Sequence, residues 1–337
     1  MKQRLAWIDY AKVFSICLVV SFHIPPRFGG MGGELIRLLR MPAFFLIAGF
    51  LFNSNKFHSF KEFLLHRSRQ LLVPYVAFFG IFYILWLLFG RSLSGDEAHW
   101  STPLWQFISG QPEIIVATYW FIACLFSIQV IYFLLQKVLP KKGVFAVCVV
   151  LSLGSNCLDI PNIWNVASAL AYLPFYAFSN CYKEYIHTVS FRTNPLSVML
   201  LLVVAVAGIW MRNRCADDIF WGEQARHALF LVSGLCLLSP YISLCKMVGK
   251  AVGNRRWVEV IGRNTIVILA LQNYCIGLLK LVFDRLSGTI GFLDNHAWLN
   301  PVLTVAIVIG LYPLLVLVER RVPWLAGRRS TTNVKSE

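Results

Sequence analysis

Three ionisable residues share one side of the first apolar segment of the chain. Asp9, Lys12 and His23 lie within residues 7–24, WIDYAKVFSICLVVSFHI. At ~100° per residue in a helix, Asp9 and Lys12 are about 60° apart, and Lys12 and His23 about 20° apart. A rise of ~1.5 Å per residue places His23 about 16 Å beyond Lys12 along the helix axis. Asp9 can pair with Lys12 and orient it, while an imidazole suits proton removal from a hydroxyl near neutral pH.

Placing these three residues in a membrane costs free energy. Ionisable groups at membrane depth cost several kcal/mol, and they typically face a protein interior, a water-filled cavity or a reaction site. An enzyme site fits the pattern. A proton or substrate path in a membrane transporter or polysaccharide-export component fits it as well. The three residues therefore predict function at this helix and leave both classes open.

The composition supports a membrane location. The chain has 337 residues, of which 58% are hydrophobic and only 14% are charged. A soluble domain of this size would carry about 25% charged residues, so the composition indicates an integral membrane protein in contact with a lipid bilayer. The net charge of +15 could suggest nucleic acid as a partner. We expect no such partner, because a positive excess in short loops between spans records topology instead.

The elements that must position these residues are membrane-spanning helices. A hydrocarbon core of ~30 Å requires about 20 apolar residues per span. The sequence predicts an all-α, polytopic protein of about ten spans, in one transmembrane domain over residues 1–325, followed by a short polar cytoplasmic tail, 326–337. The expected spans are 7–25, 34–53, 71–89, 114–136, 143–157, 164–182, 195–211, 227–247, 258–280 and 298–318.

Loop charges predict the orientation of the spans. With the N-terminus inside, the internal segments hold twenty Lys and Arg residues, and the external segments hold seven, Arg27, Arg91, Arg212, Arg214, Arg226, Lys280 and Arg285. This asymmetry follows the positive-inside rule with both termini cytoplasmic. Asp9 and Lys12 are then near the cytoplasmic face, and His23 lies toward the outer leaflet.

Two groups of arginines are further candidates. Arg67 and Arg69 precede the third span on its cytoplasmic side and suit an anion, because guanidinium groups match phosphate oxygens in a bidentate way. They could equally anchor the helix and set its orientation. Arg40 lies about 9 Å inside the second span at ~1.5 Å per residue, where it faces a cavity or extends toward the interface.

Uncharged candidates fall in the fourth and ninth spans. Trp120, in the run Tyr119–Trp120–Phe121, could stack on a sugar ring, although aromatic runs in membrane helices are mostly packing. Gln272 belongs to a polar side of the ninth span that could line a cavity or join helices. The seven histidines form no HxxxH or HExxH pattern, so we expect no metal site.

Four segments, in order along the chain, resemble the membrane-bound acyltransferase-3 family, which includes fucose 4-O-acetylase-like and other polysaccharide O-acyltransferases. WIDYAKVFSICLVVSFH is similar to the family's first helix, in which a basic residue and a histidine are separated by ten residues; here these are Lys12 and His23. RMPAFFLIAGFLF, RSRQLLVPYV and IGRNTIVILALQN resemble its second, third and late helices, and Tyr119–Trp120–Phe121 its LWFL run. Arg40, Ala48 and Gln272 depart from the His, Ser and His that many members have.

The resemblance implies an O-acyltransferase of the bacterial inner membrane. It would move an acyl group, most simply acetyl, from cytoplasmic acyl-CoA to a hydroxyl of an envelope or exported polysaccharide or lipid-linked glycan. Acetyl-CoA would be a co-substrate, with no permanently bound cofactor. We expect His23 to be catalytic with Asp9 and Lys12, Arg67 and Arg69 to bind the donor, and Arg40, Trp120 and Gln272 to line a cavity or acceptor pocket.

Overall fold

The computed structural model describes residues 5–90, 99–155, 157–158, 160–191, 194–214 and 222–328. Over these ranges the chain is helical and contains no β-strand, which confirms the all-α prediction. The longer helices are α1 Ala6–His23, α2 Gly30–Leu51, α3 Phe60–Arg67, α4 Val73–Leu85, α8 Trp120–Val138, α9 Lys141–Ser155, α10 Val166–Cys181, α12 Pro195–Arg214, α13 Gly222–Val252, α14 Arg256–Arg263, α15 Thr265–Ser287, α16 Leu299–Gly310 and α17 Tyr312–Arg321.

Short helices and turns connect these elements. They are η1 Ser54–Lys56, η2 Ser68–Leu72, η3 Trp86–Gly90, α6 Thr102–Ile108, α7 Glu113–Val116, η4 Ala117–Tyr119, η5 Ile163–Asn165, α11 Lys183–Thr188, η7 Phe292–Asn295 and η8 Pro323–Ala326.

Seven helices among the described residues are long and apolar enough to cross a membrane. They cover Ala6–His23, Phe60–Phe89, Glu113–Val138, Pro195–Arg214, Gly222–Val252, Thr265–Ser287 and Leu299–Arg321. A multi-pass membrane protein is thereby confirmed. The other three expected spans correspond to α2, which carries Glu34, Arg37 and Arg40, and to α9 and α10, which have 15 and 16 residues.

Two helices differ from the expected spans. The helix that contains the expected third span begins at Phe60, eleven residues before the expected start of the span, because α3, the π-helical turn η2 and α4 form one continuous helix. The ninth span is interrupted at Asn264, between α14 and α15. There the side-chain amide of Asn264 donates to the carbonyl oxygen of Val260 at 2.7 Å, a local bond that competes with continuation of the helix.

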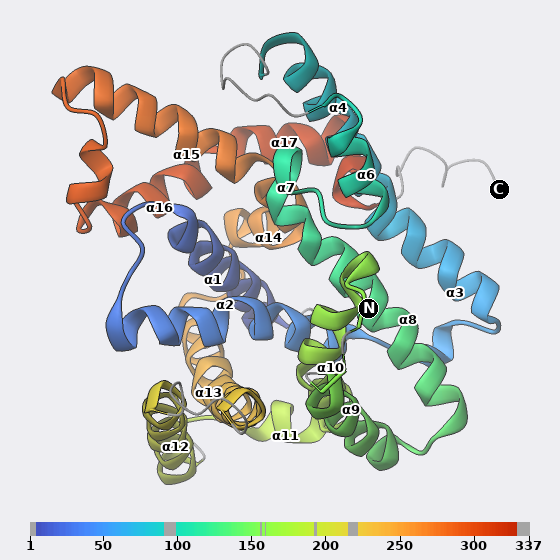
Figure 1. The fold of residues 1–337 in the computed structure, drawn as a ribbon. Coiled ribbons are helices and arrows are strands. Elements are labelled where there is room, and N and C mark those ends of the chain that lie inside the picture. The colour runs from blue at the N-terminus through green and yellow to red at the C-terminus, as the bar shows by residue number, and fades with distance from the viewer. Residues whose placement is uncertain are drawn as a thin grey trace.

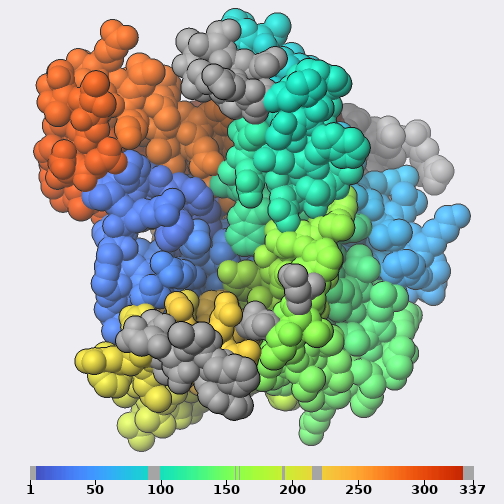
Figure 2. Space-filling view, in the orientation of Figure 1, coloured from blue at the N-terminus to red at the C-terminus, as the bar shows by residue number. Residues whose placement is uncertain are grey.

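Helix α1 lies in the interior of the bundle. It packs against α2, α13, α14, α15 and α16, and residues on all of its sides are buried (Figure 1). The Tyr241 hydroxyl of α13 donates to the carbonyl oxygen of Ala11 at 2.6 Å, so the Ser15 hydroxyl donates to Tyr241 at 2.7 Å. In the space-filling view the blue N-terminal segments border both the yellow and the orange segments of the C-terminal half (Figure 2). Helix α1 is thus held by elements distant in sequence.

Helix α2 is joined closely to α10. Gly49 faces the backbone of Tyr176, and a Cβ at this position would collide with the Tyr176 carbonyl oxygen. The Asn180 amide donates to the carbonyl oxygens of Gly49 and Phe52, each at 2.8 Å, and so satisfies the C-terminal end of α2. This contact fixes the C-terminal end of α2 against α10, and α2 also packs against α1.

Candidate functional site

A cavity of about 290 Å³ lies among α1, α2, the Phe60–Phe89 helix, α8, α14, α15 and the C-terminal turn η8. Its apolar wall comes from Phe44, Ile47, Phe121 and Leu125. Its polar wall carries four basic side chains and two amides, Lys12, Arg67, Arg263, Arg328, Gln70 and Gln129. A partly open cavity with several cations and an apolar side suits an anionic ligand that also has an apolar part.

Lys12 lines this cavity from α1, and Asp9 precedes it by three residues on the same helix. Asp9 is 7% exposed. Gly262 of α14 lies against it: a Cβ there would stand 3.3 Å from the Asp9 carbonyl oxygen and 3.4 Å from its Oδ1. The absence of a side chain at position 262 therefore allows α14 to approach the acidic end of α1, and it brings the neighbouring Arg263 to the cavity.

Arg67 reaches the same cavity from the Phe60–Phe89 helix. Its Nη1 donates to Gln70 Oε1 at 2.7 Å, and its guanidinium carbon lies 5.3 Å from the Phe52 ring centroid. Its buried Nε has no hydrogen-bond partner among the described residues. Arg69 is exposed and does not line the cavity. Residues two apart in a helix point about 200° apart, so the helix cannot present Arg67 and Arg69 to one ligand-binding wall.

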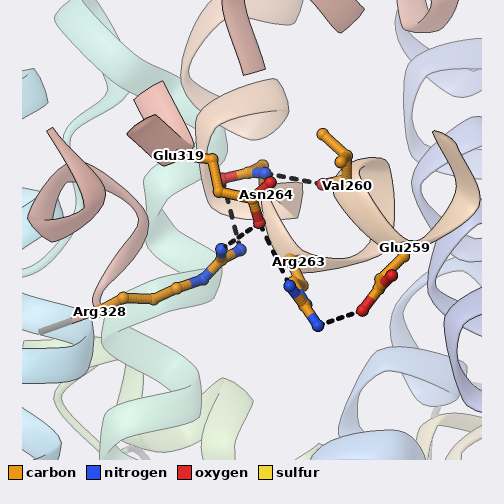
Figure 3. A network of polar contacts seen from close by, with 6 residues as sticks. All are labelled: Glu259, Val260, Arg263, Asn264, Glu319 and Arg328. Carbon is orange, nitrogen blue, oxygen red and sulfur yellow. Dashed lines mark hydrogen bonds and ion pairs between the residues drawn. The ribbon is translucent and has the colours of Figure 1, made fainter. Parts of the chain in front are cut away.

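Arg263 and Arg328 belong to a network that closes one side of the cavity (Figure 3). Glu319 Oε1 lies 2.6 Å from Arg328 Nη1 and 3.5 Å from Arg263 Nη1. Arg263 Nη2 also pairs with Glu259, and Arg328 Nη2 donates to Asn264 Oδ1 at 3.4 Å. The network joins α14, α17 and the segment after η8.

His23 lies at the far end of α1 and does not line this cavity. Its Nδ1 is 2.7 Å from the carbonyl oxygen of Val19. A carbonyl oxygen only accepts, so Nδ1 carries the hydrogen. Nε2 is therefore the nitrogen of the neutral ring that can take up a proton.

Asn300 of α16 holds this end of α1 in place. Its amide donates to the carbonyl oxygens of Ser21 and Ile24, each at 2.9 Å, and its Oδ1 accepts from the Ser21 hydroxyl at 2.7 Å. Asn300 is fully buried. Three hydrogen bonds from one side chain satisfy the end of the helix that carries His23.

The structure places Arg40 next to the end of α1 that carries His23. The Arg40 guanidinium carbon lies 3.5 Å from the Phe22 ring centroid, and its Nε is buried without a hydrogen-bond partner among the described residues. Arg40 and His23 interact electrostatically. The Tyr172 side chain also lies near Arg40, and its ring centroid is 6.4 Å from that of Trp120. Tyr172 is thus a neighbour of both Arg40 and Trp120, and neither of these two residues lines the cavity.

Gln272 is enclosed within the protein. It is 0% exposed, and both polar atoms of its amide lack a hydrogen-bond partner in the part of the chain that the structure describes. A buried amide without partners costs about 1–3 kcal/mol. Nearby on α15, the carbonyl oxygen of Leu269 accepts from the Thr118 hydroxyl at 2.6 Å. That bond links the late IGRNTIVILALQN segment to the run containing Trp120.

The comparisons with known proteins support one family over nearly the whole chain. Residues 5–320 match the model of the family described as Acyltransferase domain. The chain belongs to the acyltransferase-3 family. No curated protein and no solved structure matches it. The resemblance inferred from the first, second, third and late helices is confirmed, and the protein is a membrane acyltransferase with a family match from α1 to α17.

For this acyltransferase, the sequence did not single out all of the cavity residues. Gln70, Gln129, Arg263 and Arg328 line the cavity, yet none was a candidate. Arg263 stands in the IGRN motif that carried the family resemblance, and Arg328 entered only as one of the internal loop charges. Over the described ranges, no group of three or more His, Cys, Asp or Glu side chains is placed to hold a metal ion.

Proposed function

We propose that this acyltransferase moves an acetyl group from cytoplasmic acetyl-CoA to a hydroxyl of an envelope or exported polysaccharide, or of its lipid-linked precursor. The observation that carries the proposal is the convergence of Lys12 and Arg67 on one cavity with an apolar wall. These residues come from different helices, and both suit the phosphate groups of a donor. Acetyl-CoA is a co-substrate, and no permanently bound cofactor is needed.

The donor residues divide into two roles. Arg67, held by Gln70, binds phosphate inside the cavity, and Lys12, oriented by Asp9, binds phosphate or balances the charge there. Arg69, on another side of the helix, adds positive charge at the surface where the donor enters.

His23 acts on the acceptor. As a general base, its Nε2 takes the proton of the acceptor hydroxyl while the hydroxyl oxygen attacks the thioester carbonyl carbon. The C–S bond breaks, and CoA leaves as the thiolate. In an acyl-enzyme route, Nε2 itself would first accept the acyl group. Arg40 is the proposed oxyanion stabiliser, with Trp120 and Gln272 in the acceptor pocket.

The proposed membrane arrangement follows the charge asymmetry. Ten spans, with α2, α9 and α10 crossing beside the seven helices that are long and apolar enough to cross alone, leave both termini cytoplasmic in the bacterial inner membrane. The cavity with Lys12 then faces the donor side, and His23, about 16 Å along α1 at ~1.5 Å per residue, faces the acceptor side.

The test uses surface glycans and purified protein together. Mass spectrometry of glycans from a deletion strain should show one ester restored by wild type but not by His23→Gln. Proteoliposomes with labelled acetyl-CoA should show transfer that is lost in His23→Ala and retained in His58→Ala, a variant of an exposed histidine. Unchanged transfer in His23→Ala would overturn the catalytic role, and wild type that binds no CoA would favour a transporter.

A further inference from the structure

The cavity has two arginines beyond those that the proposed function uses. Arg263 and Arg328 line it together with Lys12 and Arg67. They come from the end of α14 and from the segment after η8, and they meet at Glu319 of α17. Both guanidinium groups lie near one carboxylate oxygen of Glu319, and Arg263 also pairs with Glu259.

That shared carboxylate oxygen is the anionic atom on which the two guanidinium groups converge. Glu319 Oε1 lies 2.6 Å from Arg328 Nη1 and 3.5 Å from Arg263 Nη1. Figure 3 shows that the two arginines reach Glu319 from different parts of the chain. Guanidinium groups bind carboxylate and phosphate oxygens by the same charge-assisted hydrogen bonds, so a phosphate can replace this carboxylate as their partner. Glu319 therefore keeps the two cations together at the cavity wall while no phosphate is present, and Glu259 holds Arg263 from its other side.

The ion pairs of Glu319 with Arg263 and Arg328 are weak enough for another anion to replace Glu319. The side chains of Arg263, Arg328 and Glu319 are 40%, 27% and 20% exposed. Ion pairs with this degree of exposure contribute about 0–1 kcal/mol. A phosphate, with more charge and more acceptor oxygens than a carboxylate, can compete for both guanidinium groups.

The backbone places Arg328 at the cavity by a turn that only glycine accommodates. Gly327 has φ +71, and a Cβ there would collide with the carbonyl oxygen of Gln70. Gln70 is also the residue that orients Arg67. The C-terminal turn is thereby seated against the helix that supplies Arg67, so the basic residues of both segments face the same space.

We propose that Arg263 and Arg328 bind phosphate of the acyl-CoA donor, and that Glu319 is a positioning residue that holds them in its absence. The proposal rests on the proposed function, because it assumes a CoA donor. It predicts that recognition of the phosphate-bearing part of CoA, rather than of the pantetheine arm, depends on these two arginines.

The test compares two probes on purified full-length protein, CoA and pantetheine, which lacks the phosphates. Arg263→Gln and Arg328→Gln should each weaken CoA binding about tenfold or more and leave pantetheine binding unchanged. Glu319→Gln should retain or tighten CoA binding, since it removes the competing charge. The matched control is Arg320→Gln, which changes an exposed arginine next to Glu319 that does not line the cavity.

The outcomes separate this proposal from the one it rests on. Wild type that binds no CoA would refute the donor assignment itself, and with it this proposal. Wild-type CoA affinity in both arginine variants would overturn only the role of Arg263 and Arg328. Equal loss of CoA and pantetheine binding with a lowered melting temperature would show that the arginines support the fold rather than the ligand.

Discussion

At the scale of single residues, the site depends on side chains that hold the catalytic candidates rather than on those candidates alone. His23 is at the end of a helix whose last carbonyl groups accept from Asn300. Arg67 is oriented by Gln70, and Asp9 packs against Gly262. None of these supporting residues has a distinctive spacing in the sequence. Their contribution comes from contacts across the bundle.

Asn300→Asp should destabilise the protein and misplace His23. The change keeps the shape of the side chain but replaces the donor amide with a buried carboxylate facing the carbonyl oxygens of Ser21 and Ile24. We expect a loss of about 3 kcal/mol of stability, seen as a lower melting temperature, and reduced acyl transfer with CoA binding retained.

Thr304→Val is the control for that variant. The Thr304 hydroxyl makes only a 3.5 Å contact with Asn300 Oδ1, so its loss should cost less than about 1 kcal/mol. Equal effects of the two substitutions would contradict the role given to Asn300.

At the scale of elements, close contacts between helix backbones hold the helices that line the cavity in place. The close α2–α10 contact requires Gly49, because a Cβ there would collide with the Tyr176 backbone. At the α1–α14 contact, a Cβ on Gly262 would stand only 3.3 Å from the Asp9 carbonyl oxygen, so glycine lets the two helices pack more closely. The break at Asn264 then turns α14 away from α15, so Arg263 can face the cavity while α15 continues as a long apolar helix.

Gly49→Ala and Gly80→Ala should have opposite effects on stability. The Gly49 Cβ would strike the Tyr176 backbone, which costs about 1–3 kcal/mol, whereas Gly80 lies in α4 with no atom within 4 Å of an added Cβ. Alanine at position 80 should stabilise the helix by about 0.5–1 kcal/mol. Thermal unfolding in one detergent measures both, and a stable Gly49→Ala protein would refute the close α2–α10 contact.

At the scale of the whole molecule, the number of crossings decides on which side each loop lies. Seven helices are long and apolar enough to cross alone, and α2, α9 and α10 would need their neighbours to shield charge or to make up for short length. Ten crossings place the loop after α13 in the cytoplasm. Seven crossings place it outside.

A thiol introduced at exposed Asn254, in that loop, in a background with Cys157 and Cys215 changed to Ser, should react with a membrane-impermeant maleimide only after spheroplasts are permeabilised. Exposed Cys157, in a background with Cys215 changed to Ser, is the positive control, because both arrangements put it outside. Labelling of Asn254→Cys in intact spheroplasts would favour seven crossings and overturn the ten-span arrangement.

The sequence by itself determined the class of protein, the helical fold, the family and the helix that carries Asp9, Lys12 and His23. These depend on composition and on local spacing, which a linear chain displays directly. The sequence predicted the ends of helices less well. The long Phe60–Phe89 helix depends on a π-helical turn, and the break at Asn264 depends on a side-chain hydrogen bond; periodicity reveals neither.

Only the tertiary structure decided which basic residues share a cavity. The sequence treated Arg67 and Arg69 alike, although the helix points them to different sides, and it gave no reason to group Arg263 and Arg328 with Lys12. These residues are brought together by Gly262 and Gly327, where the lack of a side chain lets distant segments approach. Such proximity is a property of packing between helices, and no pattern within a single helix records it.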